Sequence, residues 1–229
     1  MSDSAAKPFF QTAADRVRVK ICGITNARDA EAAIEAGADA LGLNLCPVSK
    51  RFLNLDRESD WILQLPERIA RVAVVADPVI EEATRWFESS LFDCLQLHGH
   101  ESLAFCESFS GFTLIKAVRL DSLEALNQVR DYPVFSFLLD SHHEGLLGGT
   151  GVPFDWDLLK NVAVAKPIII AGGLTPDNVT RLLKIVRPHA VDVSSGVESA
   201  PRRKDFSKMR DFIAAVKSAS SSWLLNPDS

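Results

Sequence analysis

Short apolar runs alternate with amphipathic stretches along the chain from residue 17 to residue 218. The apolar runs are rich in β-branched residues, which favour strands. They occupy residues 17–22, 38–45, 71–76, 93–98, 112–118, 133–140, 167–172 and 190–195. A stretch with helical periodicity follows each run, at residues 29–36, 56–65, 79–89, 101–108, 122–130, 156–161, 177–186 and 205–218. The pattern therefore predicts eight consecutive strand–helix units.

Strands separated by helices pair in parallel, and runs that are apolar throughout are typical of strands covered on both faces. Eight units in roughly 200 residues favour an α/β fold with a single (β/α)8 TIM barrel over a doubly wound open sheet, which needs fewer strands. The predicted organisation is a flexible N-terminal extension at 1–16, the barrel at 17–218 and a C-terminal tail at 219–229. Within the extension, Phe9 and Phe10 are candidates for docking onto the body.

Hydrophobic residues make up 47% of the 229 residues and charged residues 24%, which is the composition of a globular protein with a substantial core. The net charge of −5 gives no reason to expect nucleic acid or an anionic membrane as a partner. The cysteines, Cys22, Cys46, Cys94 and Cys106, form no CxxC pair and no metal-ligand spacing, which favours a reduced, cytoplasmic compartment. We expect neither a secretory signal nor a membrane-spanning segment.

Glycine-containing turns follow the last two predicted strands. Gly172-Gly173 comes after the first of them and Ser194-Ser195-Gly196 after the second. In a barrel both turns lie at the same end of the sheet, where backbone N–H groups and a helix N-terminus bind a phosphate monoester. Gly149, in a glycine-rich loop before these turns, is a third candidate for this cradle, and a flexible lid is the alternative for that loop. The sequence therefore predicts a small phosphorylated metabolite as the ligand.

Cys22 and Asp140 end the first and sixth predicted strands. A thiol near a helix N-terminus is favoured as thiolate, so Cys22 is a candidate base or nucleophile; taken alone, a small core residue at the rim is the better interpretation. Asp140 follows apolar residues that would bury it unless it is paired or catalytic, and the alternative is a surface turn. The first and sixth strands are three steps apart around eight. Their end residues therefore face each other obliquely across the mouth, as an acid and a base would.

Other residues near the predicted strand ends are candidates for binding. Arg51 lies in the loop after the second strand and is a candidate for binding a substrate carboxylate in a bidentate manner, with Lys50 as a poorer alternative. For both, a solvated surface residue is at least as good an interpretation. His98 either contacts the substrate or satisfies a polar position at a strand end. The adjacent His142 and His143 do not make a metal motif, and we expect no metal.

Seven motifs, in order along the chain, closely resemble the phosphoribosylanthranilate isomerase family of tryptophan biosynthesis. They are KICGIT at 20–25, PVSKRF at 47–52, LQLHG at 95–99, LLDS at 138–141, GGTGVPFDW at 148–156, AGGLTPDNV at 171–179 and VDVSSGVE at 191–198. The resemblance covers residues 18–218, which is nearly the whole predicted barrel. Any one motif is weak evidence, whereas seven in the family's order are highly specific.

The resemblance implies a single barrel that needs no cofactor. It implies conversion of N-(5-phosphoribosyl)anthranilate to 1-(o-carboxyphenylamino)-1-deoxyribulose 5-phosphate by an Amadori rearrangement. Asp140 would be the general acid that protonates the furanose ring oxygen, and Cys22 the general base that takes the proton from C2′. Arg51 would hold the anthranilate carboxylate. The phosphate would lie on Gly149, Gly173, Ser195 and Gly196. The implied partner is the small-molecule substrate, and the expected state is a monomer, with a homodimer as the alternative.

The chain departs from the family pattern in two loops. The loop after the second strand reads LNLCPVSKRF, without the aromatic residues that usually precede its proline, which bears on how the anthranilate ring is held. The final loop reads SAPRRKD where the family usually has a glycine, at Arg202 or Arg203.

Three other functions are the alternatives. A ribulose-phosphate epimerase would need metal-binding histidines and acidic residues at successive strand ends, which the sequence lacks. An indole-glycerol-phosphate synthase would use lysine and glutamate at its strand ends, where Lys116 is the obvious lysine of this chain. A non-catalytic phosphosugar-binding barrel would need neither Cys22 nor Asp140.

Overall fold

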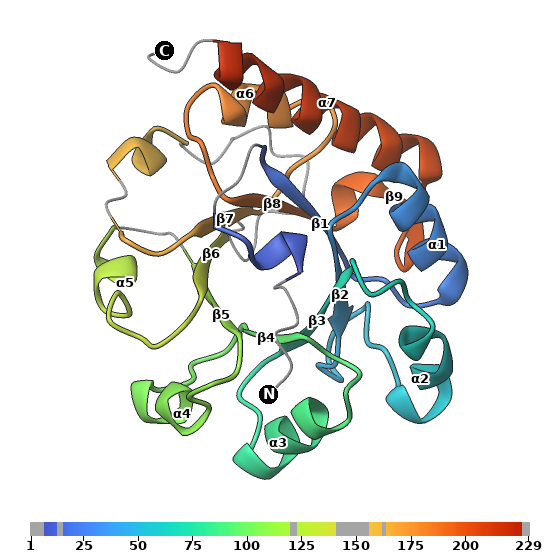
Figure 1. The fold of residues 1–229 in the computed structure, drawn as a ribbon, viewed down its shortest axis with the longest axis vertical. Helices are drawn as coiled ribbons and strands as arrows, with labels where there is room; N and C mark the ends of the chain where they lie inside the picture. Colours follow the sequence, from blue (N-terminus) through green and yellow to red (C-terminus); the bar gives the residue numbers. More distant parts are fainter. Residues whose placement is uncertain (1–6, 13–15, 120–122, 141–155, 162–163, 226–229) are drawn as a thin grey trace.

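The structure of the protein is a computed structural model that describes residues 7–12, 16–119, 123–140, 156–161 and 164–225. Eight strands close into a parallel barrel in their order along the chain, and β1 pairs with both β2 and β8 (Figure 1). The strands are β1 (Arg18–Cys22), β2 (Ala40–Asn44), β3 (Ala70–Val75), β4 (Cys94–Leu97), β5 (Leu114–Arg119), β6 (Ser136–Asp140), β7 (Ile168–Ala171) and β8 (Ala190–Val193). The closed barrel confirms the predicted fold and excludes the open doubly wound sheet.

Helices surround the barrel on the outside (Figure 1). They are α1 (Ala27–Ala36), α2 (Leu55–Leu63), α3 (Ile80–Glu88), α4 (Leu103–Ser108), α5 (Leu123–Asn127), α6 (Val179–Leu183) and α7 (Phe206–Leu225). Between β6 and β7 the predicted helix is instead a 3-10 helix, η2 (Trp156–Asn161). The last helix continues to Leu225, past residue 218, where a tail was expected to begin. Within the described ranges, no helix has the length and apolar character to cross a bilayer.

Local signals determine where the helices begin and end. The Asn26 side chain accepts a hydrogen bond from the backbone N–H of Asp29 at the start of α1, and Ser102 accepts one from Phe105 at the start of α4. Gly37 ends α1 with a φ of 102°, a left-handed conformation that glycine adopts without strain. These signals mark the start of α1 and α4 and the end of α1, whereas α3 and α6 begin without a side-chain cap.

Side chains of each strand alternate between the barrel interior and the layer beneath the helices. The interior cluster is made of small and apolar residues: Ala40, Ala70, Val72, Cys94, Ile115, Ala117, Leu138, Ile169, Ala171 and Ala190. The intervening residues, such as Val19 and Ile21 of β1, belong to the larger cluster under the helices. On β1 the alternation therefore places Lys20 and Cys22 on the interior face.

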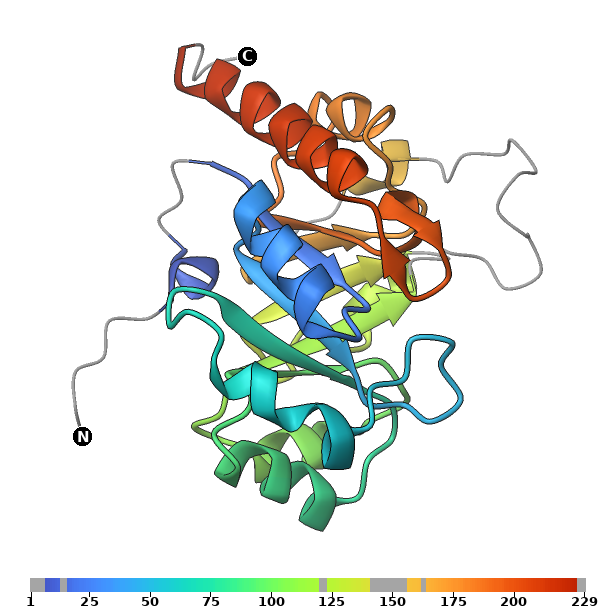
Figure 2. The ribbon, with the colours of Figure 1, turned by 90° about the vertical axis from the view of Figure 1, so that its right-hand side faces the viewer.

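The N-terminal segment closes one end of the barrel. The 3-10 helix η1 (Pro8–Phe10) places Phe9 among the interior residues, where its side chain is fully buried. His189 Nε2 lies 2.7 Å from the carbonyl oxygen of Phe9, and Lys7 forms an ion pair of 2.8 Å with Asp93. In Figure 2 the strand arrows point away from η1, which therefore lies at the N-terminal ends of the strands. Residues 7–12 thus dock on the body, a difference from the flexible extension expected for 1–16.

A short antiparallel hairpin at the other end of the barrel was not predicted. It consists of β9 (Glu198–Ala200) and β10 (Arg203–Lys204), and it follows a 3-10 helix, η3 (Ser195–Val197), that begins just after β8. The backbone N–H of Lys204 donates to Asp29 of α1 at 2.9 Å. This bond holds the hairpin beside the first helix of the barrel.

Candidate active site

Cys22 and Asp140 are the last residues of β1 and β6. Each lies two residues beyond a side chain of the interior face, Lys20 on β1 and Leu138 on β6, so both project into the mouth of the barrel. The two strands lie on different sides of the ring (Figure 1). The structure therefore brings to one mouth the two residues that the sequence nominated as base and acid.

The thiol of Cys22 lies among charged groups. Burial raises its pKa and Asp192 raises it further, while Lys20 and Lys204 lower it. The sequence suggested that a helix dipole would favour the thiolate, but burial outweighs the favourable charges. The thiol therefore keeps its proton to higher pH than an exposed cysteine, and the thiolate is a stronger base once it has formed.

A buried ion pair lies directly beneath Cys22. Lys20 Nζ is 2.9 Å from Asp192 Oδ1, and the Lys20 side chain has no exposed surface. The two residues are partners in the register between β1 and β8, so the closure of the barrel creates the pair. Gly42 of β2 leaves room for this arrangement, because a Cβ there would lie 2.8 Å from Cys22 Sγ and 2.9 Å from Lys20 Nζ.

His98 lies beside the carboxyl group of Asp140, with Nε2 3.6 Å from Oδ2. This distance is longer than a hydrogen bond and suits an electrostatic contact or a small rearrangement. On the other side of the ring, Gln96 Nε2 lies 3.3 Å from His98 Nδ1. When the Gln96 amide donates to Nδ1, the proton of a neutral imidazole is on Nε2, facing Asp140. The structure thus gives His98 a place next to the predicted acid.

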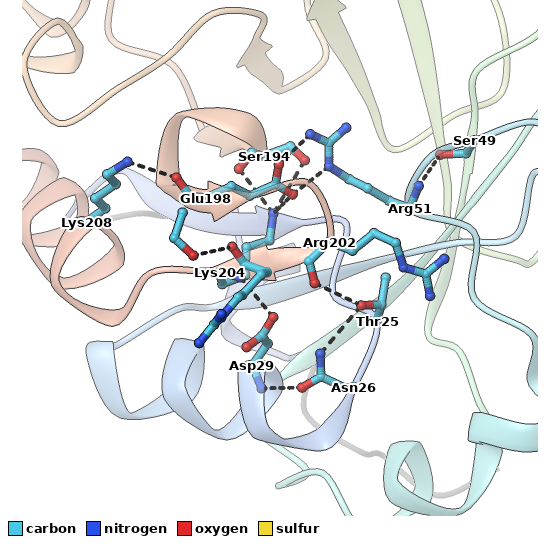
Figure 3. Close-up of polar contacts among 12 residues, drawn as sticks. Thr25, Asn26, Asp29, Ser49, Arg51, Ser194, Glu198, Arg202, Lys204 and Lys208 are labelled. Carbon is cyan, nitrogen blue, oxygen red and sulfur yellow. Dashed lines mark hydrogen bonds and ion pairs between the residues drawn. The ribbon is translucent and has the colours of Figure 1, made fainter.

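Arg51, in the loop after β2, passes over Gly23 at the end of β1 and points toward Glu198, which follows the turn after β8 (Figure 3). Its Nε and Nη2 donate to the two carboxylate oxygens of Glu198 at 2.7 and 2.6 Å. A Cβ at Gly23 would overlap the Arg51 side chain, so this glycine, with a φ of 75°, makes room for it. The bidentate partner of Arg51 in the structure is therefore Glu198. A substrate carboxylate would meet the other edge of the guanidinium, at Nη1 and Nη2.

Glu198 is shared with a second cation, Lys204 of β10. Lys204 Nζ lies 3.1 Å from Glu198 Oε1 and donates to the carbonyl oxygen of Ser194 at 3.1 Å (Figure 3). Burial raises the pKa of Glu198, but the hydrogen bonds and charges of Arg51 and Lys204 outweigh it and hold the pKa below its usual range. Glu198 is thus a carboxylate at neutral pH. It links the loop after β2 to the turn after β8.

The predicted phosphate-binding turns lie at the ends of β7 and β8. Gly172 and Gly173 have φ values of 92° and 62°, which turn the backbone sharply after β7. Ser195 and Gly196 belong to η3, and a Cβ at Gly196 would overlap the carbonyl oxygen of Leu174. The two turns are therefore in close contact. Gly149, the third predicted contributor, lies outside the described residues.

Sequence reasoning missed the charged residues that support the site, namely Lys20, Asp192, Glu198 and Lys204. The alternation along β1 does contain a signal for Lys20, because it places this lysine on the same face as Cys22. The other three depend on contacts between distant parts of the chain.

Lys116 does not lie in the mouth. Its neighbours Ile115 and Ala117 face the interior, so Lys116 faces the helices, where its Nζ lies 2.7 Å from Glu101 Oε2. This orientation removes it as a synthase-like catalytic lysine. In the part of the chain that the structure describes, His, Cys, Asp and Glu form no group of three that would suit a metal. His142 and His143 lie outside that part.

Comparison with known proteins agrees with the geometry. Residues 19–215 match the family described as N-(5′-phosphoribosyl)anthranilate (PRA) isomerase. A curated relative of that name from Magnetococcus marinus is 43% identical over 207 residues, which cover 89% of this chain and 96% of the relative.

Solved structures of the same name superpose on the barrel. The crystal structure of phosphoribosyl anthranilate isomerase from Thermotoga maritima is similar, with a TM-score of 0.82 and 36% identity, over 88% of this chain and 99% of the other. Another is a complex with reduced 1-(o-carboxyphenylamino)-1-deoxyribulose 5-phosphate, with a TM-score of 0.77 and 34% identity over 88% and 99% of the two chains. This chain belongs to the N-(5′-phosphoribosyl)anthranilate isomerase family.

Proposed function

We propose that this member of the family isomerises N-(5′-phosphoribosyl)anthranilate in tryptophan biosynthesis, with Asp140 as the general acid and Cys22 as the general base. The observation that carries the assignment is the projection of both side chains into one barrel mouth from different strands. An acid and a base on different sides of a small substrate can act on two of its atoms without moving.

The acid half of the reaction is assigned to Asp140. Its carboxyl group donates a proton to the furanose ring oxygen, the C1′–O bond breaks, and the nitrogen lone pair forms the protonated Schiff base. The side chain of Asp140 is 24% exposed, which leaves it accessible to a substrate in the mouth. His98, whose Nε2 is 3.6 Å from Asp140, is suited to orient this carboxyl group and to return its proton.

The base half is assigned to Cys22. Its thiolate takes the proton from C2′, and the electrons of the C–H bond flow to the iminium nitrogen, so an enolamine forms. Tautomerisation of the enolamine gives the ketone product. A carbon next to an iminium group is acidic enough for a thiolate, and the surroundings that raise the pKa of Cys22 make it a stronger base.

Binding is assigned to the two ends of the substrate. Arg51, held by Glu198, presents its remaining edge to the anthranilate carboxylate. The turns with Gly173, Ser195 and Gly196 direct backbone N–H groups to the phosphate, and Gly149, outside the described residues, is proposed as a further contributor. The proposed working unit is a monomer, with a homodimer as the alternative.

The test is direct. Purified protein is mixed with freshly prepared phosphoribosylanthranilate, and the loss of anthranilate-type fluorescence is followed, with Cys22→Ser as the matched variant. Fast decay with the native chain and decay slower by several powers of ten with the variant are expected. No decay with the native chain would overturn the activity, and equal decay in both would overturn the role of Cys22.

A further inference from the structure

We infer that Lys20 is a positioning residue for this reaction: its ammonium group, held by Asp192, stabilises the thiolate of Cys22 from inside the barrel. The inference rests on the proposed role of Cys22 as the base. It assigns a task to a lysine that contacts the catalytic thiol from below rather than the substrate.

The position of Lys20 needs an explanation because most side chains in the barrel interior are apolar. Gln96 and Ser136 are buried there as neutral polar side chains, and Arg18 lies nearer the N-terminal end, so Lys20 is a charged group in the middle of the barrel. A lysine with no exposed surface loses its hydration, and buried lysines occur almost always with a partner. Asp192 supplies that partner at 2.9 Å. Two apolar side chains would fill the same space without this loss of hydration. The ion pair therefore contributes less to stability than apolar packing would, and stability alone does not explain it.

The geometry places the ammonium group beside the thiol. Lys20 and Cys22 lie two residues apart on the same face of β1. Gly42 provides the common space, because a Cβ built on it would lie within 2.9 Å of both Lys20 Nζ and Cys22 Sγ. The chain thus omits a side chain at the one point of β2 where a side chain would separate the two groups.

The charges around Cys22 explain why a cation is needed there. Asp192 faces it from β8, Lys204 from β10, and Arg51 from the loop after β2, while Cys94 of β4 faces Lys20. When Cys22 loses its proton, a second anion forms next to Asp192 in a poorly solvated space. Without Lys20 the two anions would repel each other with little screening.

The alternative is a purely structural ion pair. In that case removal of Lys20 would lower the melting temperature and leave the titration of Cys22 where it was. The pKa of Lys20 itself agrees with the electrostatic role: burial alone would lower it, but Asp192 and Cys22 together raise it, so the side chain stays charged.

The decisive measurement is the pH dependence of alkylation of Cys22 by iodoacetamide, read by peptide mass spectrometry so that Cys46 is separated. In Lys20→Met the midpoint should move to higher pH by at least about one unit, a tenfold loss of thiolate at a given pH. The limb of the kcat/KM pH profile that reports the deprotonation of Cys22 should move to higher pH by the same amount. In Lys20→Arg, the alkylation midpoint and the kcat/KM profile should both return most of the way to their native positions. An unmoved midpoint in folded Lys20→Met would overturn the inference.

Asp192→Asn keeps Lys20 and should shift the alkylation midpoint of Cys22 in the opposite direction. Loss of the neighbouring anion should move the Cys22 midpoint to lower pH, because the thiolate then takes the place of Asp192 as the anion that pairs with Lys20. A midpoint that stays or rises would contradict the inference even if Lys20→Met failed to fold.

Lys116→Met is the matched control, because Lys116 is also a buried lysine with a carboxylate partner but faces the helices. It should lower the melting temperature without moving the Cys22 midpoint. The two proposals fail separately: turnover retained in Cys22→Ser overturns the role of Cys22, whereas an unmoved alkylation midpoint overturns that of Lys20.

Discussion

The two ends of the barrel differ in the side chains that occupy their centres. At the N-terminal end the barrel is closed by Phe9, which packs among small interior residues and lies edge-on to Phe10 at a ring distance of 5.3 Å. At the C-terminal end the side chains are charged and share partners, as Glu198 does with Arg51 and Lys204. Ion pairs occur at both ends, since Lys7 also pairs with Asp93 beside η1. The packing of Phe9 contributes mainly stability, whereas the charged groups around the mouth contribute little net stability and are proposed to serve the chemistry.

The largest effect should be a loss of turnover at the mouth. Asp140→Asn removes the proposed acid and should lower kcat by about a thousandfold or more, because an amide cannot donate the required proton. The free energy of unfolding should change by no more than about 0.5 kcal/mol, as expected for a partly exposed residue. Steady-state kinetics and urea unfolding measure both quantities. Near-normal turnover would remove Asp140 from the mechanism.

The opposite result is expected at the closed end. Phe9→Ala should lower the free energy of unfolding by about 3 kcal/mol, because a buried aromatic side chain is lost from the interior. Its kcat should stay within a factor of two or three. Phe112→Ala is the control, since Phe112 is 43% exposed, and it should cost about 1 kcal/mol. A strong loss of kcat in Phe9→Ala would show that the N-terminal end affects activity as well as stability.

A change at Arg51 should affect binding more than chemistry. Arg51→Ala should raise KM about tenfold to a hundredfold through loss of a charged hydrogen bond to the substrate carboxylate, with a smaller change in kcat. Lys50→Ala is the neighbouring control and should leave KM unchanged. The reverse result would move carboxylate recognition from Arg51 to Lys50. Glu198→Gln should give an intermediate KM, because Arg51 then loses its ion-pair partner.

The smallest effect concerns the hairpin beside the site. Arg202 has a φ of 68°, which strains a residue with a side chain. Arg202→Gly should stabilise the protein by at most about 1 kcal/mol. Glycine removes the backbone strain at this φ, but it also loses more conformational entropy on folding than arginine, and the two effects nearly cancel. Arg203→Gly, at the adjacent position of β10, should instead destabilise it by about 0.5–1 kcal/mol. Thermal unfolding of both variants checks the sign; destabilisation by Arg202→Gly would show that the side chain outweighs the strain.

Much of the fold is readable in the chain, because each strand–helix unit carries its own pattern. All eight strands occur where apolar runs predict them, from β1 to β8. The hairpin of β9 and β10 was not predicted, because its strands are short and the sequence Ser199-Ala200-Pro201 is typical of a turn. The position of the strained Arg202 matches a departure that the sequence does show, since the family usually has a glycine at Arg202 or Arg203.

The candidate site also contains residues that the sequence predicts and residues that it does not. Strand ends can be found locally, so Cys22 and Asp140 were accessible from the sequence. Their supporting partners were not, because Lys20 meets Asp192 across 172 positions of the chain and Arg51 meets Glu198 across 147. Such pairs exist only after the barrel has closed and fixed the register of β1 against β8.

The contact between Gly196 and Leu174 has a consequence for how this barrel can change over time. Because a side chain at Gly196 would collide with the backbone after β7, the two turns occupy one shared space. A side chain at Gly196 would therefore require the backbone after β7 to move, whereas a Cβ at Gly173 would meet open space. The loop after β2 tolerates new side chains more readily, because Val48 is 97% exposed and a larger residue has room there.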